Sequence, residues 1–153
     1  MAELLVDGNA LRRSEETQFR MEGWIACAPC EDLLGIHIQK AAAGQAVLTM
    51  PFTVKLAQGG GFMHGGALTT LGDTAVAMAI KSLLPPDTIF ATTELHLDFV
   101  APVKEGTVTA EAVVTGPVQR IFQGAATLFD DDGRVVARLK TQFKVARGQG
   151  FDD

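Results

Sequence analysis

The segment "GALTTLGDTAVAMAIKSLLPP", which begins at Gly66, constrains the fold of this chain more than any other stretch. Its residues are almost all apolar or small, and it carries a single acid, Asp73. The pattern predicts a helix of about 18 residues that Pro85 and Pro86 stop. A helix that is apolar nearly all round must be covered on most sides. A buried carboxylate is also costly unless something satisfies it, so Asp73 needs an explanation.

The rest of the chain supplies the strands that can cover such a helix. Before it, "GIHIQKAAAGQAVLTMPFTV" predicts strands over residues 36–41 and 45–54, joined at a turn that contains Gly44. After it, residues 88–145 alternate between apolar and polar positions, as in Leu95, Leu97 and Phe99, and predict four strands. Short connections such as Asp132-Gly133 indicate antiparallel pairing. We therefore expect an α+β fold, with a curved antiparallel sheet of about six strands wrapped around one long central helix.

The chain has 153 residues, and we expect one domain over 1–153. Its first 25 or so residues are predicted to be helical, with Asn9 as a cap, and Pro29 begins a short helix that stops at Gly35. Residues 1–30 would then form an N-terminal extension of short helices. The motif Cys27-x-x-Cys30 lacks both the βαβ context of a redox site and the second ligand pair of a zinc site, so we expect no function for it.

Charge and hydropathy exclude several classes of partner. The formal net charge is -5 and no run of Lys or Arg occurs, so we expect no nucleic-acid partner. The N-terminus lacks the pattern of a signal peptide, and no stretch reaches the roughly 20 apolar residues that span a bilayer. We expect a cytoplasmic protein without a membrane partner.

Small and polar residues form one narrow stripe of the predicted helix, at Gly66, Thr69, Thr70 and Asp73. The stripe leaves space for a ligand beside Asp73. At the helix start, Gly65 and Gly66 present backbone N–H groups without side chains, in the positive end of the helix dipole. Such groups can hold a carbonyl oxygen that becomes an oxyanion. Gly65 and Asp73 are roughly 12 Å apart along the helix, so both can act on one carbonyl only if two antiparallel helices of a dimer share the site.

Several simpler interpretations compete with this one. Asp73 can be a structural acid that Thr69 or Thr70 hydrogen-bonds, and His64 can be a packed loop residue. The segment "GGGFMHGG" lacks the lysine and Ser/Thr of a phosphate-binding P-loop. The alternating Glu94, His96 and Asp98 have metal-ligand spacing, but alternating charge on an exposed strand face explains them more simply, and we expect no metal.

The motif "HGGALTTLGDTAVAMA" resembles the signature of hotdog-fold acyl-CoA thioesterases, in the branch related to phenylacetyl-CoA and 4-hydroxybenzoyl-CoA thioesterases. That signature is His-Gly-Gly, six residues and an acid, as in His64-Gly65-Gly66 followed by Asp73. The segments "LLGIHI" and "ATTELHLDFVAPVKEGTVTAEAVV" also resemble the family, so that the likeness covers roughly residues 30–145. It implies the hotdog fold and hydrolysis of an acyl-CoA in a homodimer, or in many relatives a dimer of dimers.

The resemblance also implies roles for individual residues. Asp73 would be the general base or the nucleophile, and the Gly65 N–H would polarise the thioester carbonyl. Thr92 would orient the carboxylate or water, and His64 would support the site. Gln58 stands where the best-known members have Asn and offers the same amide on a longer arm.

Coenzyme A would enter as part of the substrate, with no other cofactor. Gly66 and Thr70 would lie against the substrate. The CoA phosphates would lie near Arg120, and Lys104 is the weaker candidate for this contact. Two alternatives remain open. Gln58 permits a binding protein that holds acyl-CoA without turnover. The fold also permits a hydratase or dehydratase, but such enzymes need a His paired with an acid in a different sequence motif, and we find no match to that motif. The residues do not specify the acyl group.

Overall fold

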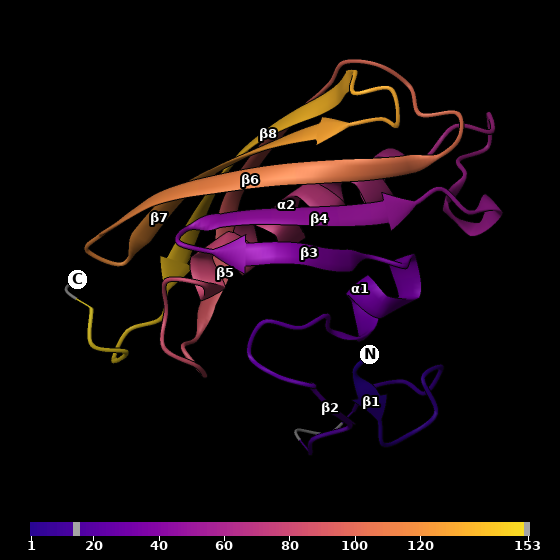
Figure 1. Ribbon diagram of the computed structural model, residues 1–153. Coiled ribbons are helices and arrows are strands. Elements are labelled where there is room, and N and C mark those ends of the chain that lie inside the picture. The colour runs from indigo at the N-terminus through magenta and orange to yellow at the C-terminus, as the bar shows by residue number, and fades with distance from the viewer. Residues whose placement is uncertain (14–15, 152–153) are drawn as a thin grey trace.

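The computed structural model of the protein describes residues 1–13 and 16–151, and Figure 1 shows their arrangement. One antiparallel sheet of six strands curves around the long helix α2, which spans Gly65–Lys81. The strand order is β3-β4-β6-β7-β8-β5, which places β3 and β5 at the two edges. The strands are β3 His37–Ala42, β4 Gln45–Pro51, β5 Phe90–Phe99, β6 Thr107–Val118, β7 Ile121–Phe129 and β8 Val135–Val145. The predicted α+β architecture is confirmed.

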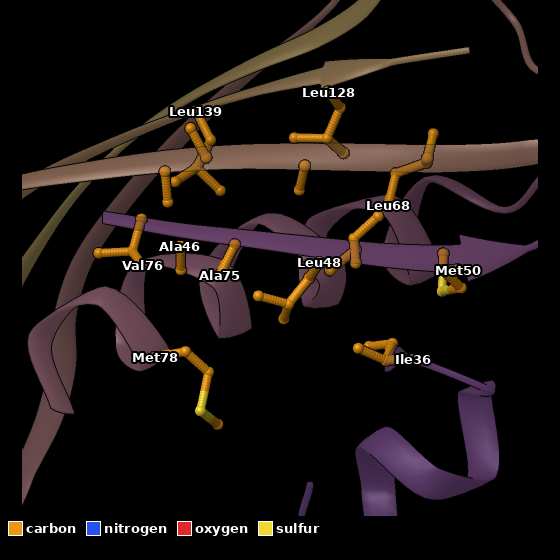
Figure 2. Packing of buried hydrophobic residues seen from close by; sticks show 14 of the residues in the cluster. Ile36, Ala46, Leu48, Met50, Leu68, Ala75, Val76, Met78, Leu128 and Leu139 are labelled. Carbon is orange, nitrogen blue, oxygen red and sulfur yellow. The ribbon is translucent and has the colours of Figure 1, made fainter. Parts of the chain in front are cut away.

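Helix α2 packs its apolar side against the concave face of the sheet. Figure 2 shows Leu68, Ala75 and Val76 of α2 among side chains that point inward from the strands, such as Leu48 and Leu128. The opposite side of α2 keeps Thr69, Thr70, Asp73 and Ala77 partly exposed, as the stripe in the sequence predicts. One protomer therefore leaves the small and polar face of α2 uncovered.

Strand β5 forms one edge of the sheet, and of its predicted apolar face Leu97 is partly buried, whereas Leu95 and Phe99 are exposed. It pairs with β8, with a bulge between Thr92 and Glu94. Leu97 and Phe99 lie opposite Leu139 and Ala137, whose side chains are buried beneath the sheet. Among the described residues, β5 has no partner strand on its other side.

The N-terminal segment differs from the prediction. Its described residues hold a short sheet of β1 (Glu3–Leu4) and β2 (Phe19–Arg20), and α1 (Pro29–Leu34) is the first helix. Residues 14 and 15 of the predicted helix lie outside the described residues. The prediction over 1–25 is wrong because Leu11, Phe19 and Met21 do not form a continuous helical face, and short helices need such a face to pack. Leu11 is in fact exposed.

The predicted start and stop of the short helix α1 are confirmed. Helix α1 begins at Pro29, and Gly35, whose φ of 74° is left-handed, is its C-cap.

Trp24 attaches the N-terminal segment to the end of α2. Its indole Nε1 donates to the Lys81 carbonyl at 3.0 Å, and Lys81 Nζ donates to the Trp24 carbonyl at 3.0 Å. In the described part of the chain, no helix is long and apolar enough to cross a membrane.

Candidate active site

Asp73 lies half-buried on the partly exposed face of α2, beside strand β5. The Thr92 hydroxyl on β5 donates a hydrogen bond to Asp73 Oδ1 at 2.8 Å. Burial raises the pKa of the Asp73 carboxyl, the Thr92 hydrogen bond partly offsets this, and the charge of Glu31 on α1 adds to the increase. A carboxylate with a raised pKa is a better proton acceptor than an ordinary aspartate.

The adjacent threonines do not satisfy Asp73. Thr69 Oγ1 donates to the Gly65 carbonyl at 2.8 Å, and Thr70 Oγ1 donates to the Gly66 carbonyl at 2.9 Å. Both hydroxyls therefore bond back to the turn of α2 that precedes them. The interpretation of Asp73 as an acid held by Thr69 or Thr70 is therefore wrong. The Thr70 hydroxyl already donates its hydrogen bond within the helix, so toward a ligand it can act only as an acceptor.

The first turn of α2 leaves one backbone donor for a ligand. His64 is the N-cap: its Nδ1 accepts from the Gly66 N–H at 2.8 Å, and its carbonyl accepts from Ala67 and Leu68. Among the described residues, no group accepts a hydrogen bond from the Gly65 N–H. The expectation that Gly66 serves the substrate through its N–H is wrong because His64 occupies that group. Gly65 remains the candidate for the oxyanion donor.

Gly65 and Gln58 line one cleft of about 390 Å³ at the start of α2. We call it the Phe99 cleft; its other lining residues are Phe62, Met63, Leu68 and Phe99 to Val103. Gln58 Oε1 accepts a hydrogen bond from the Gly60 N–H. Asp73 and Thr92 do not line this cleft. The Asp73 carboxylate and the Gly65 N–H therefore lie at two separate places on the chain.

The two basic candidates for binding CoA phosphates lie in unfavourable surroundings. Arg120 is only 8% exposed, and its Nη1 donates to the Val145 carbonyl at 2.9 Å. Its predicted contact with a phosphate is wrong because the guanidinium is buried in this structural bond. Lys104 is exposed, but it shares a hollow with Glu105 and the acids from Asp130 to Asp132, which disfavour an anion.

The charged face of β5 carries no assembled ligand set. His96 Nε2 lies 3.1 Å from Asp98 Oδ1, and both side chains are more than two-thirds exposed. Within the described part of the chain, no group of three His, Cys, Asp or Glu residues is placed to hold a metal ion.

Two residues near the candidate site are not singled out by the sequence. Phe99 appears there only as part of the alternating pattern of residues 88–145, whereas its ring lies against Gly65. Glu31 lies on α1, and its charge adds to the increase in the pKa of Asp73. Both relations depend on how distant segments pack.

The chain is similar in sequence and in fold to known thioester hydrolases. The chain is 40% identical over 86 residues to the acyl-coenzyme A thioesterase PaaI of Escherichia coli, covering 56% of this chain and 59% of that protein. It is 28% identical over 95 residues to 1,4-dihydroxy-2-naphthoyl-CoA hydrolase of Listeria monocytogenes, covering 61% and 77%. The solved structure of the E. coli PaaI protein matches with a TM-score of 0.72 at 27% identity, covering 80% of this chain and 87% of that one.

A long helix wrapped by a six-stranded antiparallel sheet is the hotdog fold, which the chain shares with the PaaI structure. The sequence model of the Thioesterase superfamily matches residues 60–137, which run from the loop before α2 to the start of β8. The chain belongs to this superfamily, and its class of activity is thioester hydrolysis.

Proposed function

We propose that the protein hydrolyses an acyl-CoA thioester to the free acid and coenzyme A, at two equivalent sites shared across a homodimer. The observation that carries the proposal is the half-buried Asp73 carboxylate, held by Thr92 and separate from the free Gly65 N–H. The names of PaaI and the naphthoyl-CoA hydrolase support a CoA thioester as the substrate.

The chemistry needs one carboxylate and one oxyanion donor. Asp73, as general base, takes a proton from a water molecule whose oxygen attacks the thioester carbonyl carbon. The Gly65 N–H then stabilises the negative charge on the carbonyl oxygen. When the C–S bond breaks, the CoA sulfur leaves with the electron pair and takes the proton that Asp73 removed from water, which restores the carboxylate. In the nucleophilic alternative, Asp73 itself attacks the carbonyl carbon, and the C–S bond breaks as the CoA thiolate leaves with the electron pair. Water then hydrolyses the resulting mixed anhydride, which releases the free acid, restores Asp73 and supplies the proton of the thiol.

The free edge of β5 supports the shared site. Two β5 edges that pair antiparallel about a two-fold axis extend the sheet and set two α2 helices antiparallel. Asp73 of one protomer can then approach Gly65 of its partner, which one chain cannot achieve over roughly 12 Å of helix. Pairing of two such dimers would give the tetramer seen in many relatives of this fold.

Replacement of Asp73 by Asn tests the role of the carboxylate. Asn keeps the volume and an oxygen that can accept the Thr92 hydrogen bond, so we expect the fold to survive. Release of free CoA from the best acyl-CoA should fall by at least about a hundredfold. The matched control is Asp87→Asn, an exposed acid in the turn between α2 and β5, which should retain full activity.

A panel of acyl-CoA substrates separates the enzyme from a binding protein. Near-full activity of Asp73→Asn would show that the carboxylate is structural. No CoA release by the wild type, together with saturable acyl-CoA binding, would favour the alternative of a non-catalytic binding protein.

A further inference from the structure

The ring of Phe99 lies directly against the backbone of Gly65. A Cβ atom built on Gly65 would lie 2.9 Å from Phe99 Cζ and 3.2 Å from Cε1. The three atoms nearest to that position all belong to the Phe99 ring. Carbon atoms in contact are normally about 3.5–4.0 Å apart, so no additional carbon fits between the ring and Gly65.

The backbone of Phe99 is held firmly in this place. Phe99 is the last residue of β5 and pairs with Ala137, and the next N–H, of Val100, donates to the Val136 carbonyl at 2.8 Å. Its side chain is nevertheless 58% exposed. A large ring on a fixed backbone, with more than half of its surface open, contacts the candidate oxyanion donor.

The cleft beside this ring is suited to an apolar group. Among its described lining residues, Gln58 has the only polar side chain. Its volume of about 390 Å³ exceeds the roughly 150 Å³ at which an apolar cavity already binds benzene. An acyl group of moderate size can therefore lie in this open cleft with its carbonyl oxygen at the Gly65 N–H.

Bond lengths limit how far the acyl carbon next to the carbonyl lies from Gly65. An oxygen that accepts from the Gly65 N–H lies about 2.9 Å from that nitrogen. With bonds of about 1.2 and 1.5 Å, the next acyl carbon lies within about 2.7 Å of that oxygen. This carbon is therefore within reach of the side chains packed around Gly65, of which the Phe99 ring is the nearest to the built Cβ, and a methyl branch on the side of that ring would contact it.

We propose that the Phe99 cleft binds the acyl group of the thioester, and that Phe99 is a specificity-determining residue that selects against branching at the carbon next to the carbonyl. This inference rests on the proposed function, because it takes Gly65 as the group that binds the carbonyl. The substrate class it defines is apolar acyl thioesters with an unbranched carbon at that position.

Two isomeric substrates test this selection: 3-methylbutanoyl-CoA and 2-methylbutanoyl-CoA differ only in the position of one methyl group. We expect wild-type kcat/KM to be at least about tenfold lower for the 2-methyl isomer, the size of effect that overpacking produces. Phe99→Ala should raise the 2-methyl to 3-methyl ratio of kcat/KM by about tenfold. Phe19→Ala, the same replacement on β2 and outside the cleft, is the matched control and should leave the ratio unchanged.

A binding measurement keeps the inference separate from the proposed function. Non-hydrolysable analogues with a methylene group in place of sulfur give the ratio of Kd values for the two isomers without turnover. If the wild type releases no CoA but its Kd ratio is large and Phe99→Ala abolishes it, the proposed function fails and the inference holds. If the wild type hydrolyses both substrates and Phe99→Ala leaves both ratios unchanged, the inference is overturned while the function stands.

Each variant is checked for fold and assembly by circular dichroism and light scattering. If Phe99→Ala does not fold, Phe99→Leu, which keeps an apolar side chain but removes the ring, should give an intermediate increase in the ratio. A wild type that binds neither analogue, or a Phe99→Leu ratio equal to that of the wild type, would overturn the inference.

Discussion

The hydroxyl of Thr92 and the burial of Asp73 act on the same carboxylate in opposite directions. Burial disfavours the charged form and raises the pKa of Asp73, whereas the hydrogen bond from Thr92 favours the charged form and lowers it. Glu31, from a segment forty or so residues away in sequence, adds a like charge. The proton affinity of the candidate base is therefore set by three separate elements: α2, β5 and α1.

Thr92→Val should move the acidic limb of the pH profile. Valine keeps the shape of threonine but donates no hydrogen bond, so the pKa of Asp73 should rise further. Because catalysis needs the deprotonated carboxylate, the acidic limb of kcat/KM against pH should shift to higher pH. Thr92→Ser keeps the hydroxyl and should leave the limb close to its wild-type position. An unchanged limb in Thr92→Val would mean that the hydrogen bond does not tune the base.

At the scale of elements, the close approach of α2 to the sheet depends on glycines at their contact, one on a strand and one on the helix. A Cβ on Gly124 of β7 would lie only 2.3 Å from Val76 Cγ1, and Val76 is fully buried on α2. A Cβ on Gly72 of α2 would lie 3.1 Å from Leu139 Cδ1 of β8. The helix therefore sits in the curve of the sheet at a distance that these small residues permit.

Gly124→Ala should destabilise the protein by about 1–3 kcal/mol, because the added methyl group overlaps Val76. Adding Val76→Ala removes the overlapping atoms, so the double variant should lose less stability than the sum of the two single variants. Urea unfolding measures the four free energies of this cycle. Gly23→Ala, whose Cβ would have no atom within 4 Å, is the control for glycine replacement. Additive losses would show that the two positions do not press on each other.

At the scale of the whole molecule, the proposed mechanism requires a second copy of the chain to complete the site. The partly exposed stripe on α2, the unpaired edge of β5 and the separation of Gly65 from Asp73 all point to a second copy of the chain. We expect a homodimer at least, which light scattering at micromolar concentration measures. A monomer under those conditions would contradict the shared site.

Mixing two inactive variants tests the sharing directly. Asp73→Asn lacks the base, and Gly65→Pro lacks the N–H that holds the oxyanion. In a mixed dimer both defects fall in one site and leave the other intact. Co-refolding should therefore recover about a quarter of wild-type activity, since about half of the dimers are mixed. Proline also adds a Cβ against Phe99, so the folded dimer content is measured first. No recovery in well-folded dimers would place the base and the donor in one chain.

Local pattern was enough to predict the central helix, the six strands of the large sheet and the stripe that carries Asp73, but not the exposure of Leu95 and Phe99 on β5. Helical and strand periodicities are properties of neighbouring residues, and Asp73 stands out because its own helix is otherwise apolar. The Thr92 position came from the family resemblance, and the hydrogen bond to Asp73 agrees with it.

Only the tertiary structure decided the remaining contacts, because each joins segments far apart in the chain. The N-terminal residues form a small sheet, and Trp24 attaches to the end of α2, which no local pattern specifies. The buried bond of Arg120 to the Val145 carbonyl removed a residue that looks like a surface cation in sequence. The contact of Phe99 with Gly65 likewise arises where β5 returns past the start of α2. The sequence alone determined which chemical groups this protein carries, and the packing of distant segments decided which of them a substrate can reach.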